Sequence, residues 1–192
     1  MRHSTRYLGL TLVELLMALT VTALIGAAIA SMLSAVTYGT SNTHDLRSLV
    51  AKNKTLSARI TAAVRQSRQV LDAGNDYLVL WTEDLNGSDA PDLLELQRIE
   101  RDSVNNTLTS YTPDPNATDV AYDLENDDFD TITTNLISSG DLVGERWGND
   151  VAGFAVTPDQ PDPLDATLIS YQLTLTAGGM SDVSVNAVSL RD

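Results

Sequence analysis

Carboxylates are the side chains in this sequence that are most able to do chemistry. The 192 residues include 26 Asp and Glu, two histidines and no cysteine. His3 and His44 lie before and just after an N-terminal apolar segment, so histidine catalysis, histidine metal sites and thiolate chemistry are all disfavoured. With so many acids, proximity alone does not indicate acid–base catalysis, and the sequence contains no P-loop, dinucleotide fingerprint or nucleophile elbow. We do not expect an enzyme.

One acidic segment has the length of a calcium-binding loop. The oxygen-bearing side chains at its positions one, three, five and twelve are Asp84, Asn86, Ser88 and Glu95. Calcium takes roughly six to eight oxygen ligands, and an EF-hand loop places ligands at these positions. The EF-hand glycine belongs at position six, however, which Asp89 occupies here, and the flanking residues suggest strands. Calcium binding and a merely solvated loop both stay open, and no other cofactor is expected.

A single carboxylate interrupts a long apolar segment near the N-terminus. Residues 10–36 are dominated by Leu, Val, Ala, Ile and Met, and Glu14 is their only charged side chain. As a helix this segment would be about 40 Å long, more than the ~30 Å hydrocarbon core of a bilayer. Arg2 and Arg6 precede it and favour a cytoplasmic N-terminus. A carboxylate in a membrane helix costs about 2.5–3.5 kcal/mol at the bilayer centre and somewhat less near an end, so Glu14 predicts a function and a cationic partner.

The same segment also allows a conventional secretory signal peptide. Its parts would be the basic residues, the apolar run and a small-x-small cleavage site at Ala28-Ile29-Ala30. Cleavage near Ala30 would release a soluble acidic binding protein. Two features count against this alternative: the apolar run continues to Val36, longer than a usual signal core, and Glu14 stands where such a core is purely apolar.

The residues around Glu14 resemble a known processing signal. Gly9-Leu10-Thr11-Leu12-Val13-Glu14, behind a short basic leader and ahead of an apolar helix, is similar to the class III signal of type IV pilins and type II secretion pseudopilins. The family pattern is G-F-T-L-(I/V)-E, and Leu10 stands here in place of the usual Phe. The resemblance implies that a prepilin peptidase/methyltransferase cuts after Gly9 and N-methylates Leu10.

The resemblance also implies how such a chain assembles. Cleavage creates an α-ammonium on Leu10, about one helical turn from Glu14. In a filament, the carboxylate of an incoming subunit would pair with the ammonium of its neighbour, so Glu14 and the adjacent Thr11 are assigned to assembly and register. The implied partners are other pilins or pseudopilins, the processing enzyme and the inner membrane. The chain would cross that membrane once, with its N-terminus in the cytoplasm and its C-terminal head outside.

A second helical pattern follows the apolar segment. No proline occurs before Pro91, and apolar or small residues recur every three or four positions over 37–71, which predicts one amphipathic helical face. The face consists of Leu46, Leu49, Val50, Asn53, Leu56, Ile60, Ala63, Val64, Ser67 and Leu71. The six basic residues elsewhere in this helix are either its solvated side or a surface for the acidic remainder of the chain. Gly74 and Asn75 are expected to end the helix.

The remaining residues, 72–192, are predicted to form a β-rich head. Strands are expected at 77–81, 93–101, 107–111, 151–156, 167–176 and 183–190, with a short helix or turn near 132–140. The predicted fold class is α+β: a long N-terminal α-helix, with a transmembrane half and an amphipathic half, packed on a C-terminal antiparallel β-sheet head. This order of elements is similar to J-type pseudopilins and W-type minor pilins.

Charge is unevenly distributed along the chain. Residues 72–192 carry four arginines against 24 acidic residues, whereas residues 10–71 carry six basic residues against Glu14 and Asp45. A head with this charge cannot neutralise the phosphates of nucleic acid, so we do not expect nucleic acid to bind there. Copies of the acidic head also repel each other, which favours a minor subunit. The predicted organisation is a leader (1–9), an assembly helix (10–36), a stalk helix (37–71) and an acidic head (72–192).

Overall fold

The computed structural model describes residues 11–190, and for residues 36–45 it describes the backbone only. The chain divides into two compact units, and the boundary along the sequence falls between His44 and Asp45. The predicted leader and the predicted cleavage site at Gly9 and Leu10 lie outside the described residues.

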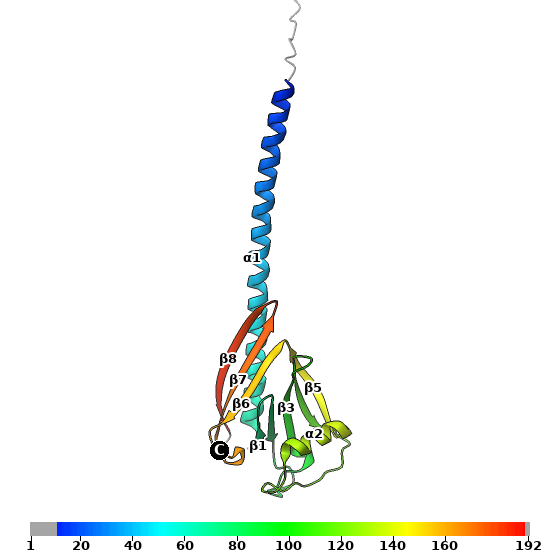
Figure 1. Cartoon of the computed structure of the whole chain (residues 1–192). Coiled ribbons are helices and arrows are strands. Elements are labelled where there is room, and N and C mark those ends of the chain that lie inside the picture. Colours follow the sequence, from blue (N-terminus) through cyan, green and yellow to red (C-terminus); the bar gives the residue numbers. More distant parts are fainter. Residues whose placement is uncertain (1–10, 191–192) are drawn as a thin grey trace, which may run out of the picture. The chain divides into compact units, whose positions relative to one another are not determined.

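Helix α1 extends from Leu12 to Gln66 and contributes residues to both units (Figure 1). From Leu12 to Ala35 its side chains are exposed all round, whereas in the second unit one face is buried. A helix that is apolar on all sides needs a non-aqueous environment, while an amphipathic helix needs a core that covers one face. The two parts of α1 therefore have different requirements.

Two antiparallel sheets form the second unit together with the last part of α1 and a short helix, α2 (Figure 1). The five-stranded sheet has the order β1-β2-β3-β4-β5, so each strand pairs with the next along the chain, and the three-stranded sheet has the order β6-β7-β8. The strands are β1 Gln69–Ala73, β2 Tyr77–Trp81, β3 Leu96–Asp102, β4 Thr107–Pro113, β5 Leu142–Asn149, β6 Val151–Pro158, β7 Leu168–Ala177 and β8 Met180–Ser189. Helix α2 comprises Phe129–Ser139, and two 3-10 helices comprise Leu93–Glu95 and Pro163–Asp165.

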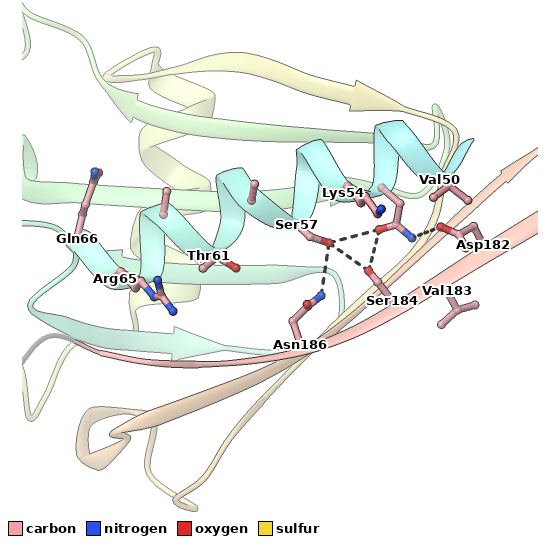
Figure 2. Close-up of a pocket in the computed structure, with 13 residues that line it drawn as sticks. Val50, Lys54, Ser57, Thr61, Arg65, Gln66, Asp182, Val183, Ser184 and Asn186 are labelled. Carbon is pink, nitrogen blue, oxygen red and sulfur yellow. Dashed lines mark hydrogen bonds between the residues drawn. The ribbon is translucent and has the colours of Figure 1, made fainter. Parts of the chain in front are cut away.

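Polar side chains join α1 to β8 (Figure 2). Asn53 of α1 is buried, and its amide donates a hydrogen bond of 2.7 Å to Asp182. The amide oxygen of Asn53 accepts a hydrogen bond of 2.7 Å from Ser184. Because a buried amide is costly unless its hydrogen bonds are made, these contacts fix the position of the helix along β8.

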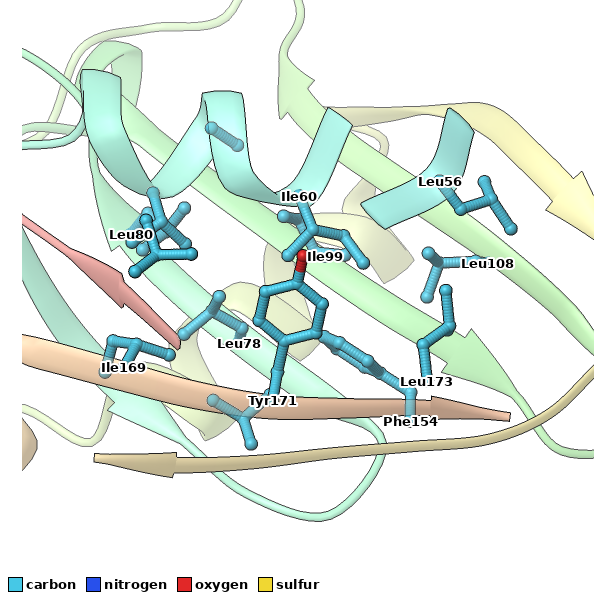
Figure 3. Close-up of a cluster of buried hydrophobic side chains, with 14 of the residues drawn as sticks. Leu56, Ile60, Leu78, Leu80, Ile99, Leu108, Phe154, Ile169, Tyr171 and Leu173 are labelled. Atoms are coloured by element: carbon cyan, nitrogen blue, oxygen red, sulfur yellow. The ribbon is translucent and has the colours of Figure 1, made fainter. Parts of the chain in front are cut away.

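The main hydrophobic core joins α1 to both sheets (Figure 3). Ile60 of α1 is fully buried in one cluster with Leu78 of β2 and Tyr171 of β7. The Tyr171 hydroxyl donates a hydrogen bond of 2.8 Å to the carbonyl oxygen of Ser57 in α1. The predicted helical face is buried from Leu49 to Ser67, as the three- and four-residue spacing requires. The predicted α+β fold class is confirmed.

Helix α1 ends at Gln66, before the predicted end at Leu71. The Ser67 hydroxyl donates a hydrogen bond of 2.7 Å to the carbonyl oxygen of Val64, and the amide of Arg68 donates one of 2.8 Å to the carbonyl oxygen of Trp81. The chain therefore leaves the helix and enters β1, in which Leu71 is buried. Leu71 is buried, as the helical spacing predicted, but the reason is different: its side chain points into the protein from strand β1.

The predicted strands are present, but some of their ends differ, and two strands of the structure, β1 and β5, were not predicted. Strand β8 begins at Met180, three residues before its predicted start. The strand predicted at 93–101 begins at Leu96, because Leu93–Glu95 forms a 3-10 turn in which Asp92 and Glu95 make a reciprocal capping box. Strand β5 was not predicted at all. It contains Gly144 and Gly148, and most of its side chains are exposed, so it lacks the apolar alternation typical of a half-buried strand.

Aspartates in the turns of the second unit should make its stability depend on pH. In each of four carboxyls, one hydrogen bond is the main cause that lowers the pKa below its ordinary value of 3.8. In the order in which the carboxyls are named next, the donors are the Asn105 side chain, the Asn126 side chain, the Thr131 amide and the Leu168 amide. The four carboxyls are those of Asp102, Asp123, Asp128 and Asp159. A carboxyl whose pKa is lowered by folding stabilises the folded state above its unfolded pKa, and this contribution is lost as pH falls through the folded pKa.

We predict that the melting temperature holds above about pH 5 and falls progressively as pH is lowered through 3.8. Burial raises the pKa of one carboxyl, Asp72, and this group acts in the opposite direction. Thermal unfolding followed by circular dichroism at a series of pH values below about 5 measures whether the four lowered pKa values outweigh that of Asp72. Asp128→Asn should flatten the profile, and a melting temperature that rises on acidification would contradict the prediction.

Candidate functional site

Thr11 and Glu14 together form the start of α1. The hydroxyl of Thr11 accepts a hydrogen bond of 3.3 Å from the amide of Glu14, and the carbonyl oxygen of Thr11 accepts the Leu15 amide at 3.1 Å. Thr11 is thus the residue that caps the helix, and Glu14 follows in the first turn, where a negative charge interacts favourably with the helix dipole. The spacing Thr-x-x-Glu is itself a signal for the start of a helix.

The apolar part of α1 has the properties of a membrane span. Within Leu12–Ala35, an 18-residue stretch has a mean hydropathy of 2.2, and none of the span is buried against the rest of the chain. At 1.5 Å per residue its 24 residues extend about 36 Å. The hydroxyls of Thr20, Thr22 and Ser31 donate to carbonyl oxygens of the preceding turn at 2.7–2.9 Å. These polar groups are therefore satisfied without water, as a bilayer requires.

Glu14 is the one charged side chain in this span. Because Leu12–Ala35 contains no lysine, arginine or histidine, the span itself cannot supply a cation to pair with the carboxylate. A partner for Glu14 within a bilayer has to come from outside these residues.

The predicted calcium loop is organised around a basic residue, Arg68. Its guanidinium lies 2.6 Å from the carboxylate of Asp84 and 2.8 Å from that of Asp89, and 4.5 Å from the centre of the Trp81 ring. The other Asp84 oxygen accepts the amides of Gly87 and Ser88. Desolvation raises the pKa of Asp84, but hydrogen bonds from the Gly87 amide and from Arg68 outweigh it and hold that pKa below its ordinary value.

Glu95, the fourth calcium candidate, is buried, and its carboxylate accepts the backbone amide of Leu85, inside the same loop, at 2.5 Å. It is 1% exposed, and its carboxylate accepts the indole N–H of Trp81 at 2.8 Å and the amide of Asp92 at 3.2 Å. The side-chain amide oxygen of Asn86 accepts a hydrogen bond of 2.8 Å from the backbone amide of Ser88. Protein donors thus already occupy oxygens of these candidates. Among residues 11–190, no three His, Asp or Glu side chains gather in a way that could hold a metal ion.

Arg68 is the residue of this loop that sequence reasoning missed. It was assigned to the basic side of a helix, yet it lies beyond the end of α1 and pairs with acids 16 and 21 residues later. No local pattern connects residues at that separation.

No family model, no curated protein and no solved structure matches this chain. The fold and the site therefore define only a broad class: an α+β protein with, among its described residues, one N-terminal helix long and apolar enough to cross a membrane.

Calcium binding at residues 84–95 stays a prediction, and it requires the ion to compete with Arg68 for Asp84. Binding to the folded state alone would raise the melting temperature by linkage. The measurement compares millimolar calcium with EDTA, in the original chain and in Arg68→Gln, where removal of the competing cation should enlarge the rise. An unchanged melting temperature in both proteins would eliminate this loop as a calcium site.

Proposed function

We propose that this chain is a structural minor pilin or pseudopilin subunit. In this proposal it is processed after Gly9 by a prepilin peptidase and assembled through its N-terminal helix into a type II secretion pseudopilus or a type IV pilus. It crosses the inner membrane once, with its N-terminus in the cytoplasm and its β-rich head outside. No catalytic step is assigned to the chain itself.

The observation that carries the proposal is Glu14 in the first turn of α1, at the start of the otherwise uncharged and fully exposed apolar span Leu12–Ala35. Such a carboxylate has a high cost in lipid unless a cation compensates it. Processing after Gly9 would place a new α-ammonium on Leu10, four residues before Glu14. Either that amine or the same amine of a neighbouring subunit can pair with the carboxylate, and pairing between subunits would fix their register.

The second unit supports the proposal less directly. It is an α+β head in which an amphipathic helical face is covered by two antiparallel sheets, as expected from the resemblance. Its acidic residues disfavour close packing of many copies, which suits a subunit present in small numbers.

The alternative to a pilin subunit is a secreted binding protein cleaved near Ala30, and the division of the chain into two units favours it. Residues 45–192 form a compact unit of their own, so a chain that began after Ala30 would keep this unit entire. An N-terminal apolar helix is also what a conventional signal peptide contains. The position of cleavage distinguishes the two functions.

We expect the mature chain to begin at Leu10 and to carry a methylated α-amine. Intact-mass measurement and N-terminal sequencing of protein purified from a host that expresses a prepilin peptidase test this directly. A matched culture that lacks the peptidase should yield the uncut chain. A mature N-terminus at Ile29 or Ser31 would refute the pilin proposal and support the secreted protein.

Glu14→Ala should leave cleavage after Gly9 intact but lower incorporation into sheared filaments by at least tenfold. The physical reason is that breaking an ion pair in a low-dielectric environment costs about 3–5 kcal/mol. Glu14→Gln removes the charge but keeps the size and shape of the side chain, and it should show the same loss of incorporation. Thr22→Ala is the matched control, since its hydroxyl bonds only within the same helix. Normal incorporation of both Glu14 variants would overturn the register role.

A further inference from the structure

Strand β8 leaves one edge of the three-stranded sheet unpaired. All ten of its residues pair with β7, from Met180 opposite Ala177 to Ser189 opposite Leu168, and no other strand in residues 11–190 pairs with β8. Exposed edges are usually protected by proline, by lysine or by a bulge. β8 contains no proline and no basic residue, and its pairing with β7 shows no irregularity. Its free edge is therefore competent to pair with another extended chain.

A groove of about 750 Å³ lies beside this strand, between β8 and α1 (Figure 2). The side chains of β8 alternate along it. Asp182, Ser184 and Asn186 face α1 and hydrogen-bond to its polar residues, as the dashed lines in Figure 2 show. Val183 and Val185 are 52% and 72% exposed. A strand added to β8 would continue this alternation, with one set of side chains toward the helix and the other beside the two valines.

The groove carries two cations that no acid of the described residues neutralises. Lys54 and Arg65 of α1 line it, and neither forms an ion pair within residues 11–190. By contrast, Lys52 and Arg59 of the same helix pair with acids at 2.7 Å and 3.6 Å. Asp182, the carboxylate that lines the groove, already accepts a hydrogen bond from Asn53. The two cations outnumber the one carboxylate of the groove, so its lining carries one excess positive charge on an otherwise strongly acidic head.

We propose that β8 and this groove bind an extended acidic segment of a partner protein, which adds a fourth strand to β6-β7-β8. Backbone hydrogen bonds to the free edge of β8 would supply affinity, and Lys54 and Arg65 would select carboxylates on the side that faces the helix. Aliphatic side chains on the opposite side would pack beside Val183 and Val185. A second copy of the chain is disfavoured as the occupant because the acidic heads repel each other.

The spacing of the two cations restricts the bound sequence. Lys54 and Arg65 are separated along α1 by about 16 Å, which equals about five residues of an extended strand. Since only alternate side chains of a strand face the groove, the two selected carboxylates stand about four or six residues apart. The partner segment is therefore a run of roughly ten residues in which acidic and aliphatic side chains alternate.

The test uses the full chain in detergent micelles and a fluorescent peptide of about ten residues, with blocked ends, in which Asp and Val alternate. Fluorescence anisotropy should show binding that weakens as salt is added. Lys54→Gln and Arg65→Gln should each weaken binding roughly two- to fivefold, as expected for exposed ion pairs. The matched controls Lys52→Gln and Arg59→Gln should leave it unchanged. A peptide with Asn in place of Asp should bind more weakly still.

Two further measurements locate the bound peptide. Alternate N-methylation of the peptide backbone should abolish binding, because it removes the donors that pair with the strand. Hydrogen exchange of the complex should show new protection in residues 180–189. The proposal is overturned if the peptide does not bind, if the control variants weaken binding as much as the groove variants, or if protection appears at β5 instead. Dimerisation of the chain that Lys54→Gln and Arg65→Gln abolish would identify a second copy as the occupant and would also overturn it.

Discussion

Burial of one face of α1 by both sheets is the contact on which the second unit depends. Ile60 and Val64 are fully buried in a cluster that includes Leu80 of β2 and Leu173 of β7. Each sheet has an apolar face that would otherwise meet water, and neither five nor three antiparallel strands can cover such a face alone. The helix supplies the missing layer. Its polar contacts to β8 then select one axial position among the many that a purely apolar surface would accept.

The same packing determines how the basic residues of the helix are used. With one face committed to the core, the cations are held on the exposed sides, beside the edges of the two sheets. Lys52 and Arg59 reach Asp150 and Glu145, and Arg68, just past the helix, organises the loop that contains Asp84. Exposed pairs of this kind contribute little to stability individually. Their effect is to neutralise Lys52, Arg59 and Arg68 locally, which leaves Lys54 and Arg65 as cations without an ion pair among the described residues.

What could be predicted from the sequence is what local periodicity encodes. The buried face of α1 follows from three- and four-residue spacing, and β2 follows from a compact run of apolar and aromatic residues, Tyr77–Trp81. Strand β5 and the true end of α1 were missed because each depends on a distant partner: β5 on its pairing with β4, and the helix end on the hydrogen bond between Arg68 and Trp81. The environment of Glu95 was missed for the same reason. The capping by Thr11 lies within three residues of Glu14 and was available from the sequence.

The apolar part of α1 imposes a different constraint, which the chain does not meet by itself. No residue of the span is buried against the rest of the protein, so the surface that covers it has to be lipid or other helices. Cleavage near Ala30 would remove most of this surface but leave Met32 and Leu33, 72% and 61% exposed, on a chain in water. It would also discard Glu14 and the capped helix start, which would then have no role after secretion. Under the proposed function, retention of the helix would give both features a role, because a carboxylate inside a membrane is costly unless it is paired, and a pair between subunits would compensate that cost.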